Sequence, residues 1–173
     1  MNKNEELFFA CKSGDLQKVR KLLDDGADVN SKYIDEWTAL HVATENGHID
    51  IVRLLIKKGA SVNSRIHDDN RYDDEVTLIN NGKTALLLAA ENGYQDIVEL
   101  LIEQSADVNA KSDYQKLTAL HLVSVNGYEK IAKILIEKGA DVNAIDEFNG
   151  TPLLCAIIKG YKDIAELLIC KGA

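Results

Sequence analysis

The chain repeats one phrase along most of its length, and no other feature constrains its fold as strongly. The plainest copy, residues 38–63, reads TALHVATENGHIDIVRLLIKKGASVN, and a degenerate copy occupies residues 5–30. Three further copies occupy residues 84–109, 118–143 and 151–173. Glycines in the middle of the copies are 33, 46, 34 and 33 residues apart: Gly14, Gly47, Gly93, Gly127 and Gly160. Such a period indicates a repeat array, in which each unit buries its apolar face against the next.

Each full copy contains the signals of two short helices. In the second copy Thr38 precedes a stripe of small apolar residues and can cap the first helix. Gly47 ends that helix, because glycine readily adopts the left-handed conformation that a helix end favours. A broad apolar face over residues 51–56 then predicts a second helix, which Gly59 ends. In the third copy Ser105 replaces this last glycine, and a left-handed serine there costs some stability.

The repeated phrase resembles the ankyrin repeat. That family's signature begins T-P-L-H-x-A and continues through a second helix to G-A-D-V-N, and TALH, TALL, TPLL and GADVN stand at the matching places here. The resemblance implies an all-α fold, a single ankyrin-repeat solenoid domain over residues 1–173 with five helix-turn-helix units and β-hairpin fingers. The expected units are an N-terminal cap at about 1–32 and repeats at 33–65, 66–111, 112–145 and 146–173.

The connection between the second and third repeats is 13 residues longer than the one before it. The resemblance places this insert, residues 64–81, in an extended finger. Its acidic side chains are hard oxygen ligands, but they lack the spacing of an EF-hand. A solvated acidic loop is the simplest interpretation, and a weak cation site and a docking surface for a basic partner are the alternatives. The side chains concerned are Asp68, Asp69, Asn70, Asp73, Asp74 and Glu75.

Composition narrows the classes of function. The formal net charge of −8 argues against a nucleic-acid partner, because phosphate binding needs a basic face. No apolar run is as long as a membrane-spanning helix, and MNKNEELFF lacks the apolar core of a secretory signal, so no membrane association is expected. The three cysteines show no C-x-x-C spacing. We expect an intracellular, cytoplasmic protein; a host regulator and a bacterial effector delivered into a host cell are both open, because ankyrin arrays serve both.

No set of residues indicates catalysis. His41 and His121 fall at the histidine of the ankyrin motif, which in the family hydrogen-bonds the neighbouring backbone, and Leu87 and Leu154 fill the same place in other copies. A catalytic or metal-binding role does not tolerate this alternation. The sequence shows no phosphate-binding glycine-rich loop and no motif around a Cys/His or Ser/His/Asp set. We therefore predict a non-enzymatic protein with no cofactor and no metal.

The two ends of the array differ in sequence. In the first copy Lys18 and Lys21 replace Ile51 and Leu54 of the second copy, which suits a cap whose outer face is in water. The last copy has no polar capping unit, so either further sequence follows or an exposed apolar face favours self-association; its apolar residues include Ile157, Ile158, Ile164 and Leu168. One leucine of each first helix is expected in the core: Leu40, Leu86, Leu120 and Leu153.

Positions that vary between copies are the candidates for binding. In ankyrin proteins the finger tips and the exposed end of the first helix line a concave surface that binds other proteins. Trp37 is the only tryptophan, and Tyr114 and Phe148 hold near-equivalent finger places, so these aromatic residues are the expected anchors. The alternative is that each packs against its own finger. The full predicted partner-binding set is Ile34, Asp35, Trp37, Glu45, Tyr72, Asp73, Lys83, Glu91, Tyr114, Leu117 and Phe148.

The finger turns are expected to differ in shape. The family often has glycine two residues before the threonine that begins the first helix, and only Gly82 matches here, whereas Glu36, Lys116 and Asn149 do not. The resemblance implies reversible binding of another protein, through the concave face and the long second finger. The alternative is a structural role, as a spacer or as a segment of a larger scaffold.

Overall fold

A computed structural model describes residues 2–67 and 80–173. Within these residues the chain forms ten α-helices and one short 3-10 turn, η1 (Ile34–Glu36), so the predicted all-α fold is confirmed there. Consecutive helices pack in pairs. The pairs are α1 (Lys3–Ser13) with α2 (Leu16–Asp24), α3 (Ala39–Glu45) with α4 (Ile49–Lys57), α6 (Ala85–Asn92) with α7 (Gln95–Glu103), α8 (Ala119–Asn126) with α9 (Glu129–Glu137), and α10 (Pro152–Lys159) with α11 (Lys162–Cys170).

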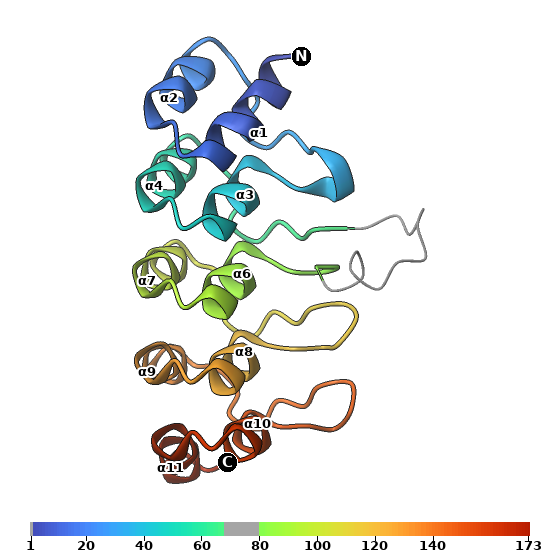
Figure 1. The fold of residues 1–173 in the computed structure, drawn as a ribbon, viewed down its shortest axis with the longest axis vertical. Helices are drawn as coiled ribbons and strands as arrows, with labels where there is room; N and C mark the ends of the chain where they lie inside the picture. Colours follow the sequence, from blue (N-terminus) through green and yellow to red (C-terminus); the bar gives the residue numbers. More distant parts are fainter. Residues whose placement is uncertain (1, 68–79) are drawn as a thin grey trace.

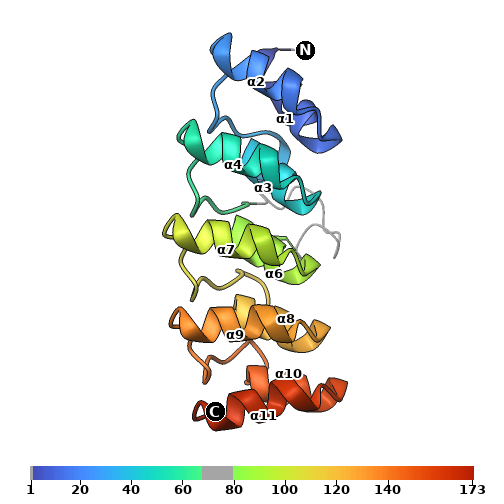
Figure 2. The ribbon, with the colours of Figure 1, turned by 90° about the vertical axis from the view of Figure 1, so that its left-hand side faces the viewer.

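The five helix pairs stack into an elongated solenoid with its termini at opposite ends (Figure 1). Each first helix contacts the first helices of the neighbouring pairs, and each second helix contacts the neighbouring second helices. Two helical layers result, and Figure 2 shows the layer of second helices in front. The connections between pairs project from the layer of first helices, away from the second helices (Figure 1). The connections and the first helices therefore share one side of the molecule.

The repeated residues fix where the helices begin and end. Thr38 caps α3 and Thr84 caps α6, and each hydroxyl accepts a hydrogen bond from the backbone N–H three residues later. Gly93 ends α6 in the left-handed conformation, with φ of 74°. A Cβ atom on Gly93 would also lie 2.6 Å from the ring of Tyr128 in the next pair. The glycine in the middle of this repeat therefore both ends a helix and makes room for the next repeat.

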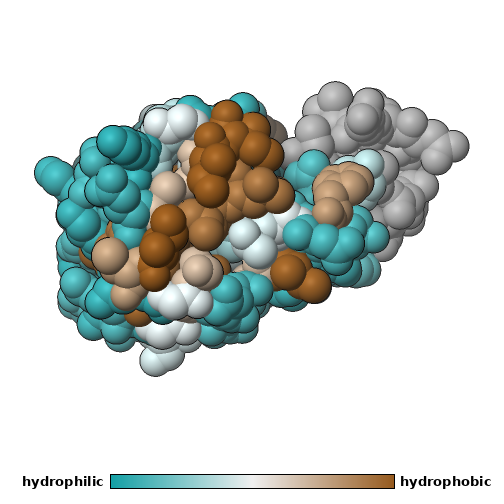
Figure 3. All heavy atoms as spheres, turned by 90° about the horizontal axis from the view of Figure 1, so that it is seen from below, coloured by the Kyte–Doolittle hydropathy of each residue, from teal (hydrophilic) through white to brown (hydrophobic). Residues whose placement is uncertain are grey.

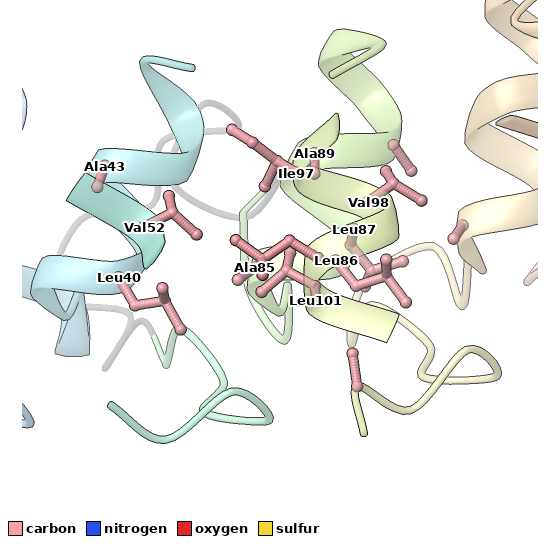
Figure 4. Packing of buried hydrophobic residues seen from close by; sticks show 14 of the residues in the cluster. Leu40, Ala43, Val52, Ala85, Leu86, Leu87, Ala89, Ile97, Val98 and Leu101 are labelled. Atoms are coloured by element: carbon pink, nitrogen blue, oxygen red, sulfur yellow. The ribbon is translucent and has the colours of Figure 1, made fainter. Parts of the chain in front are cut away.

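Neighbouring pairs share their apolar core. In Figure 4, Leu40 and Val52 of the second pair lie on the side that faces Ala85 and Ile97 of the third pair. All four side chains are buried, with at most 2% of their surface exposed. Alanine at positions such as Ala85 lets adjacent first helices approach closely, because it carries a single methyl group.

The expected core leucines are buried in three repeats and not in the fourth. Leu40, Leu86 and Leu120 are almost fully buried, as predicted. Leu153 is only partly buried, so the prediction was wrong for this residue. In the part of the chain that the structure describes, no pair stacks on the outer side of α10, and Leu153 therefore lacks the cover that its counterparts receive.

An asparagine bridge joins successive pairs. The Asn63 Oδ1 atom accepts a hydrogen bond from the Asp107 N–H (2.9 Å), and its Nδ2 donates to the Ser105 carbonyl (3.1 Å). Asn30 and Asn109 make the corresponding two bonds in their own repeats. Asn63 bridges a connection that is 13 residues longer than the one Asn30 bridges, with the same pair of bonds. The insert therefore leaves the stacking of the helix pairs unchanged.

The connections, called fingers below, span residues 31–37, 64–83, 110–117 and 144–150. Among the described residues one isolated antiparallel bridge is present, between Lys32 of the first finger and Thr38, the cap of α3. At the base of the second finger, Ile66 N–H donates to the Lys83 carbonyl (3.0 Å) and Gly82 N–H donates to the Ile66 carbonyl (2.8 Å). The predicted β-hairpins are not confirmed, since the described finger residues form turns closed by a few hydrogen bonds. Residues 68–79 of the insert lie outside the described residues.

Ser105→Gly is expected to raise the free energy of unfolding by about 0.5–1 kcal/mol. Ser105 has φ of 63°, and the glycines at the equivalent place have φ between 88° and 94°. A side chain in this left-handed region is strained, and glycine removes the strain. Chemical denaturation monitored by circular dichroism measures the change. Ser61→Gly is the matched control, since Ser61 is an exposed serine of the second repeat without positive φ, and an equal gain there would contradict the explanation.

Candidate interaction surface

Backbone hydrogen bonds connect the fingers to one another. Each runs from an N–H of one finger to a carbonyl of the finger before it: His67 to Asp35 at 3.3 Å, Asp113 to Asn81 at 2.9 Å, and Glu147 to Gln115 at 3.0 Å. The Arg65 guanidinium of the second finger adds an ion pair with the Asp113 carboxylate (2.6 Å). The fingers therefore form a row in which their main chains hold one another, and side chains on this row keep fixed relative places.

The finger turns share one backbone feature, contrary to the expectation from the sequence. The residue two before the capping threonine is left-handed in all four fingers, although only one of these residues is glycine. They are Glu36 (φ 57°), Gly82 (φ 76°), Lys116 (φ 55°) and Asn149 (φ 59°). The finger geometry is therefore imposed by closing the turn, and it places non-glycine side chains on strained backbone.

The first finger and α3 bring four of the predicted site residues together. Ile34, Asp35, Trp37 and Glu45 line one hollow of about 320 Å³ beside the first finger. Ile34 leaves 65% of its surface exposed. Trp37 is half-buried and meets the ring of His41 edge-on, with ring centroids 6.1 Å apart. Trp37 thus packs against a ring of its own repeat and also lines the hollow.

The hollow has a wall that the sequence does not single out. Phe8 of α1 and Tyr33 of the first finger stack with ring centroids 4.4 Å apart, and both line the hollow. The sequence pattern assigns Phe8 to the inward face of the first unit and therefore does not indicate that Phe8 also lines the hollow. The available signal is the concentration of aromatic residues near the start of the chain, where Phe8, Phe9, Tyr33 and Trp37 fall within 30 positions.

A polar cluster of residues from the second finger, α6 and α3 lies on the side of the molecule that the fingers and first helices share. The Lys83 Nζ atom lies 2.5 Å from a Glu91 carboxylate oxygen, and the Lys83 side chain is only 5% exposed. The Asn92 amide donates to the Glu45 carboxylate (3.3 Å), which joins α6 to α3. Partial burial of the Glu45 carboxyl, helped by the nearby Glu91 carboxylate, raises the pKa of Glu45. The cluster therefore holds two carboxylates and one ammonium group.

The remaining predicted site residues are spread along the later fingers. Tyr114 leaves 45% of its surface exposed and Phe148 77%, whereas Leu117 is half-buried against the core. Tyr72 and Asp73 lie outside the described residues. The predicted set thus divides into a compact group at the first finger and α6, and separate aromatic side chains farther along the row.

A family model described as ankyrin repeats (3 copies) matches residues 7–112, 66–146 and 111–173. The chain belongs to the ankyrin repeat family. The comparison with curated proteins gave no match. Ankyrin repeats are generally protein–protein interaction modules, which is the coarse function that membership implies.

The buried histidines of the ankyrin repeats form hydrogen bonds with backbone groups. The Thr38 N–H donates to His41 Nδ1 (3.2 Å), so the ring proton is on Nε2, which donates to the Ser64 carbonyl (2.9 Å). His121 makes the corresponding contacts with Thr118 and with a carbonyl of the following finger. Burial lowers the pKa of His41 to about 4, only partly opposed by its bond to Ser64. These neutral histidines tie a helix start to the following connection.

The Cys11 thiol is buried in the core of the ankyrin array. Burial raises the pKa of the Cys11 thiol to about 12, so it is not a nucleophile near neutral pH. Within residues 2–67 and 80–173, no group of three or more His, Cys, Asp or Glu side chains is placed to hold a metal ion. None of the helices described in these same ranges is long and apolar enough to cross a membrane. The acidic residues of the insert, Asp68 to Glu75, lie outside the described residues.

His41→Leu is expected to reduce the pH dependence of stability in mildly acidic solution. The pKa of His41 falls from 6.5 to about 4 on folding, so the unfolded chain binds a proton that the folded chain does not. The free energy of unfolding therefore decreases as pH falls from 6.5 toward 4, by roughly 3 kcal/mol from this residue. Leucine removes this proton linkage, and it already stands at the same place in α6 as Leu87.

Urea denaturation at a series of pH values measures the effect of His41→Leu. The comparison uses the slope of stability against pH, since the lost hydrogen bonds lower stability at every pH. His67→Leu is the control, because His67 is exposed in the second finger. A His41→Leu slope equal to that of the unsubstituted chain would contradict the assignment.

Proposed function

We propose that this ankyrin array binds another protein through its fingers and the exposed ends of its first helices. The observation that carries the proposal is the row of exposed apolar finger side chains on hydrogen-bonded turns, namely Ile34, Tyr114 and Phe148. Large exposed apolar side chains cost solvation free energy, and aromatic ones are the usual anchors of protein interfaces. Trp37 joins this row as a half-buried ring beside the hollow.

Rigid presentation supports this proposal physically. The fingers are tied to one another by main-chain bonds, and the asparagine bridges hold the helix pairs in register. A partner that docks on such a surface orders few additional side chains of the array, so less conformational entropy is lost on binding. The ends of the second finger belong to the same row through their main-chain hydrogen bonds, and we include this longer finger in the proposed surface.

Trp37→Ala combined with Tyr114→Ala is expected to lower the affinity for a captured partner at least about tenfold, because both rings contribute contact area to the interface. The partner is first captured from lysate of the source cell with the intact chain and identified by mass spectrometry. Its affinity for purified variants is then measured by calorimetry. Tyr161→Ala is the matched control, an exposed tyrosine at the start of α11 and away from the fingers. If the double variant keeps its helical content and its affinity for the partner is unchanged, Trp37 and Tyr114 are not anchors of the interface.

A deletion of residues 68–79 tests the contribution of the second finger. This deletion retains Arg65, which binds Asp113, and Ile66, which is buried and paired with Lys83 at the base of the finger. Loss of the partner places recognition in the insert, and retention places it on the remaining concave surface. If neither the intact chain nor the deletion variant captures a partner, the structural spacer is favoured.

The outer face of the last helix pair is apolar, and either further sequence or a second copy of the chain would cover it; association with a second copy is the second function we propose. Figure 3 looks at this end and shows apolar residues gathered on it. Leu154 leaves 45% of its surface exposed and Ile157 57%, whereas their counterparts in α6, Leu87 and Ala90, are at most 1% exposed beneath α8. The face is therefore shaped as an interface between repeats.

A second copy fits this face through its own equivalent face. The opposite end of the molecule is polar, with Lys18 and Lys21 of α2 exposed and Lys18 near the Glu6 carboxylate. Stacking of one copy's first repeat on another copy's last repeat would bury these charges against apolar side chains. Two apolar ends facing each other avoid that cost, so the expected assembly is a two-fold dimer.

Ile157→Asp is expected to keep the protein monomeric at concentrations where the unsubstituted chain dimerises, because the carboxylate would be buried in the contact. Sedimentation equilibrium over a range of concentrations measures the association. Lys18→Asp, at the polar end, is the control and should leave the dimer intact. An unsubstituted chain that sediments as a monomer throughout would reject self-association through this face.

A further inference from the structure

The second and third repeats place a glutamate at the same position of their first helix but differ in what faces it. Glu45 and Glu91 each follow their capping threonine by seven residues. In the third repeat, Lys83 directly precedes Thr84, and its ammonium group pairs with the Glu91 carboxylate at 2.5 Å. The Glu91 carboxylate is thus neutralised by a nearly buried lysine of the same chain.

The second repeat has Trp37 where the third repeat has Lys83. Glu45 accepts a hydrogen bond from Asn92, but within residues 2–67 and 80–173 no lysine or arginine forms an ion pair with it. Partial burial and the neighbouring Glu91 carboxylate raise the pKa of Glu45, and they outweigh the opposing effects of the Lys83 ammonium group and the Asn92 hydrogen bond. The exchange of lysine for tryptophan thus removes a positive charge and adds an aromatic ring at one place.

The hollow beside these two residues has the shape and chemistry of a receptor for one long cationic side chain. Its walls include the rings of Phe8, Tyr33 and Trp37, and its volume is about 320 Å³. Asp35 and Glu45 contribute two carboxylates to its lining. Lys12 of α1 is the one cationic residue that lines it among the described residues, and it is exposed. The lining therefore holds two carboxylates and one ammonium group beside three aromatic residues.

We propose that this hollow receives a lysine or arginine side chain of the partner protein, with its aliphatic stem against the aromatic rings and its charged head at Glu45. The inference rests on the proposed function, since it assigns a chemical group to the partner. The incoming cation does for Glu45 what Lys83 does for Glu91. Contact between a cation and aromatic faces is itself attractive, and apolar stems of lysine and arginine pack readily on such rings.

Other side chains match the hollow less well. A carboxylate or phosphate would face two carboxylates and be repelled. A purely apolar side chain would displace water from Glu45 without replacing its hydrogen bonds, which costs free energy. A cation with an apolar stem can pair with the carboxylates and pack on the aromatic rings at the same time.

Tryptophan fluorescence tests the inference directly, because Trp37 is the only tryptophan in the chain. The probes are N-acetyl-lysine amide and N-acetyl-arginine amide, and N-acetyl-norleucine amide is the uncharged control with a similar stem. Titrations are made at constant ionic strength. We expect a saturable change with both cationic probes, in the millimolar range, and none with the norleucine probe over the same concentrations.

Glu45→Gln is the decisive variant, because it keeps the shape of the side chain and removes its charge. We expect this variant to bind the cationic probes about tenfold more weakly than the unsubstituted chain does. Glu103→Gln is the matched control, an exposed glutamate at the end of α7, and should bind the probes like the unsubstituted chain. Equal binding of the norleucine probe, undiminished binding by Glu45→Gln, or no saturable change with either cationic probe would overturn the proposal.

The captured partner separates this inference from the proposed function. If Trp37→Ala weakens the binding of the partner and Glu45→Gln does not, protein binding by this surface is supported and the cation site is overturned. A partner unaffected by Trp37→Ala and Tyr114→Ala contradicts the proposed surface, and the probe titrations then still decide whether the hollow binds cations.

Discussion

The asparagine bridge between successive helix pairs is the contact on which the rest of the structure depends. Each bridge uses one amide group to accept and to donate, and both bonds go to the backbone of the next pair. Backbone groups are the same in every repeat, so the bridge fixes the spacing of the pairs whatever side chains the repeats carry. For that reason the array tolerates a 13-residue insert beside Asn63 without a change in register. Stability becomes a sum of repeats and their nearest neighbours.

Nearest-neighbour stacking also explains where predictions from the sequence succeeded and failed. The repeated threonines, glycines and apolar positions predicted the helix pairs, because each has the same local role in every copy. Leu153 was expected in the core and is only partly buried, since burial depends on the next pair and not on the residue itself. Glu36, Lys116 and Asn149 were expected to change the finger turns, yet all are left-handed. Turn closure outweighs the steric preference of these residues.

The candidate site was less predictable than the fold, because it is built from contacts between repeats. The sequence placed Lys83 and Glu91 on the concave side but gave no sign of their ion pair. It also gave no sign that Phe8 and Tyr33 stack to form a wall of the hollow. Such contacts join positions that have no repeated counterpart, so periodicity carries no information about them. The exposed aromatic residues were found from sequence because they depart from the repeat.

The exchange between Lys83 and Trp37 indicates how one repeat scaffold serves both stability and recognition. A lysine beside the glutamate of the first helix neutralises that carboxylate within the array, and the pair is then nearly complete without a partner. A tryptophan at the same place leaves the carboxylate dependent on hydrogen bonds and water, and opens an aromatic surface beside it. The helix pairs are joined by the same two asparagine hydrogen bonds in both cases, because neither residue takes part in these bridges. In the proposed function, a single finger position therefore determines whether this carboxylate is paired within the array or is available to a partner.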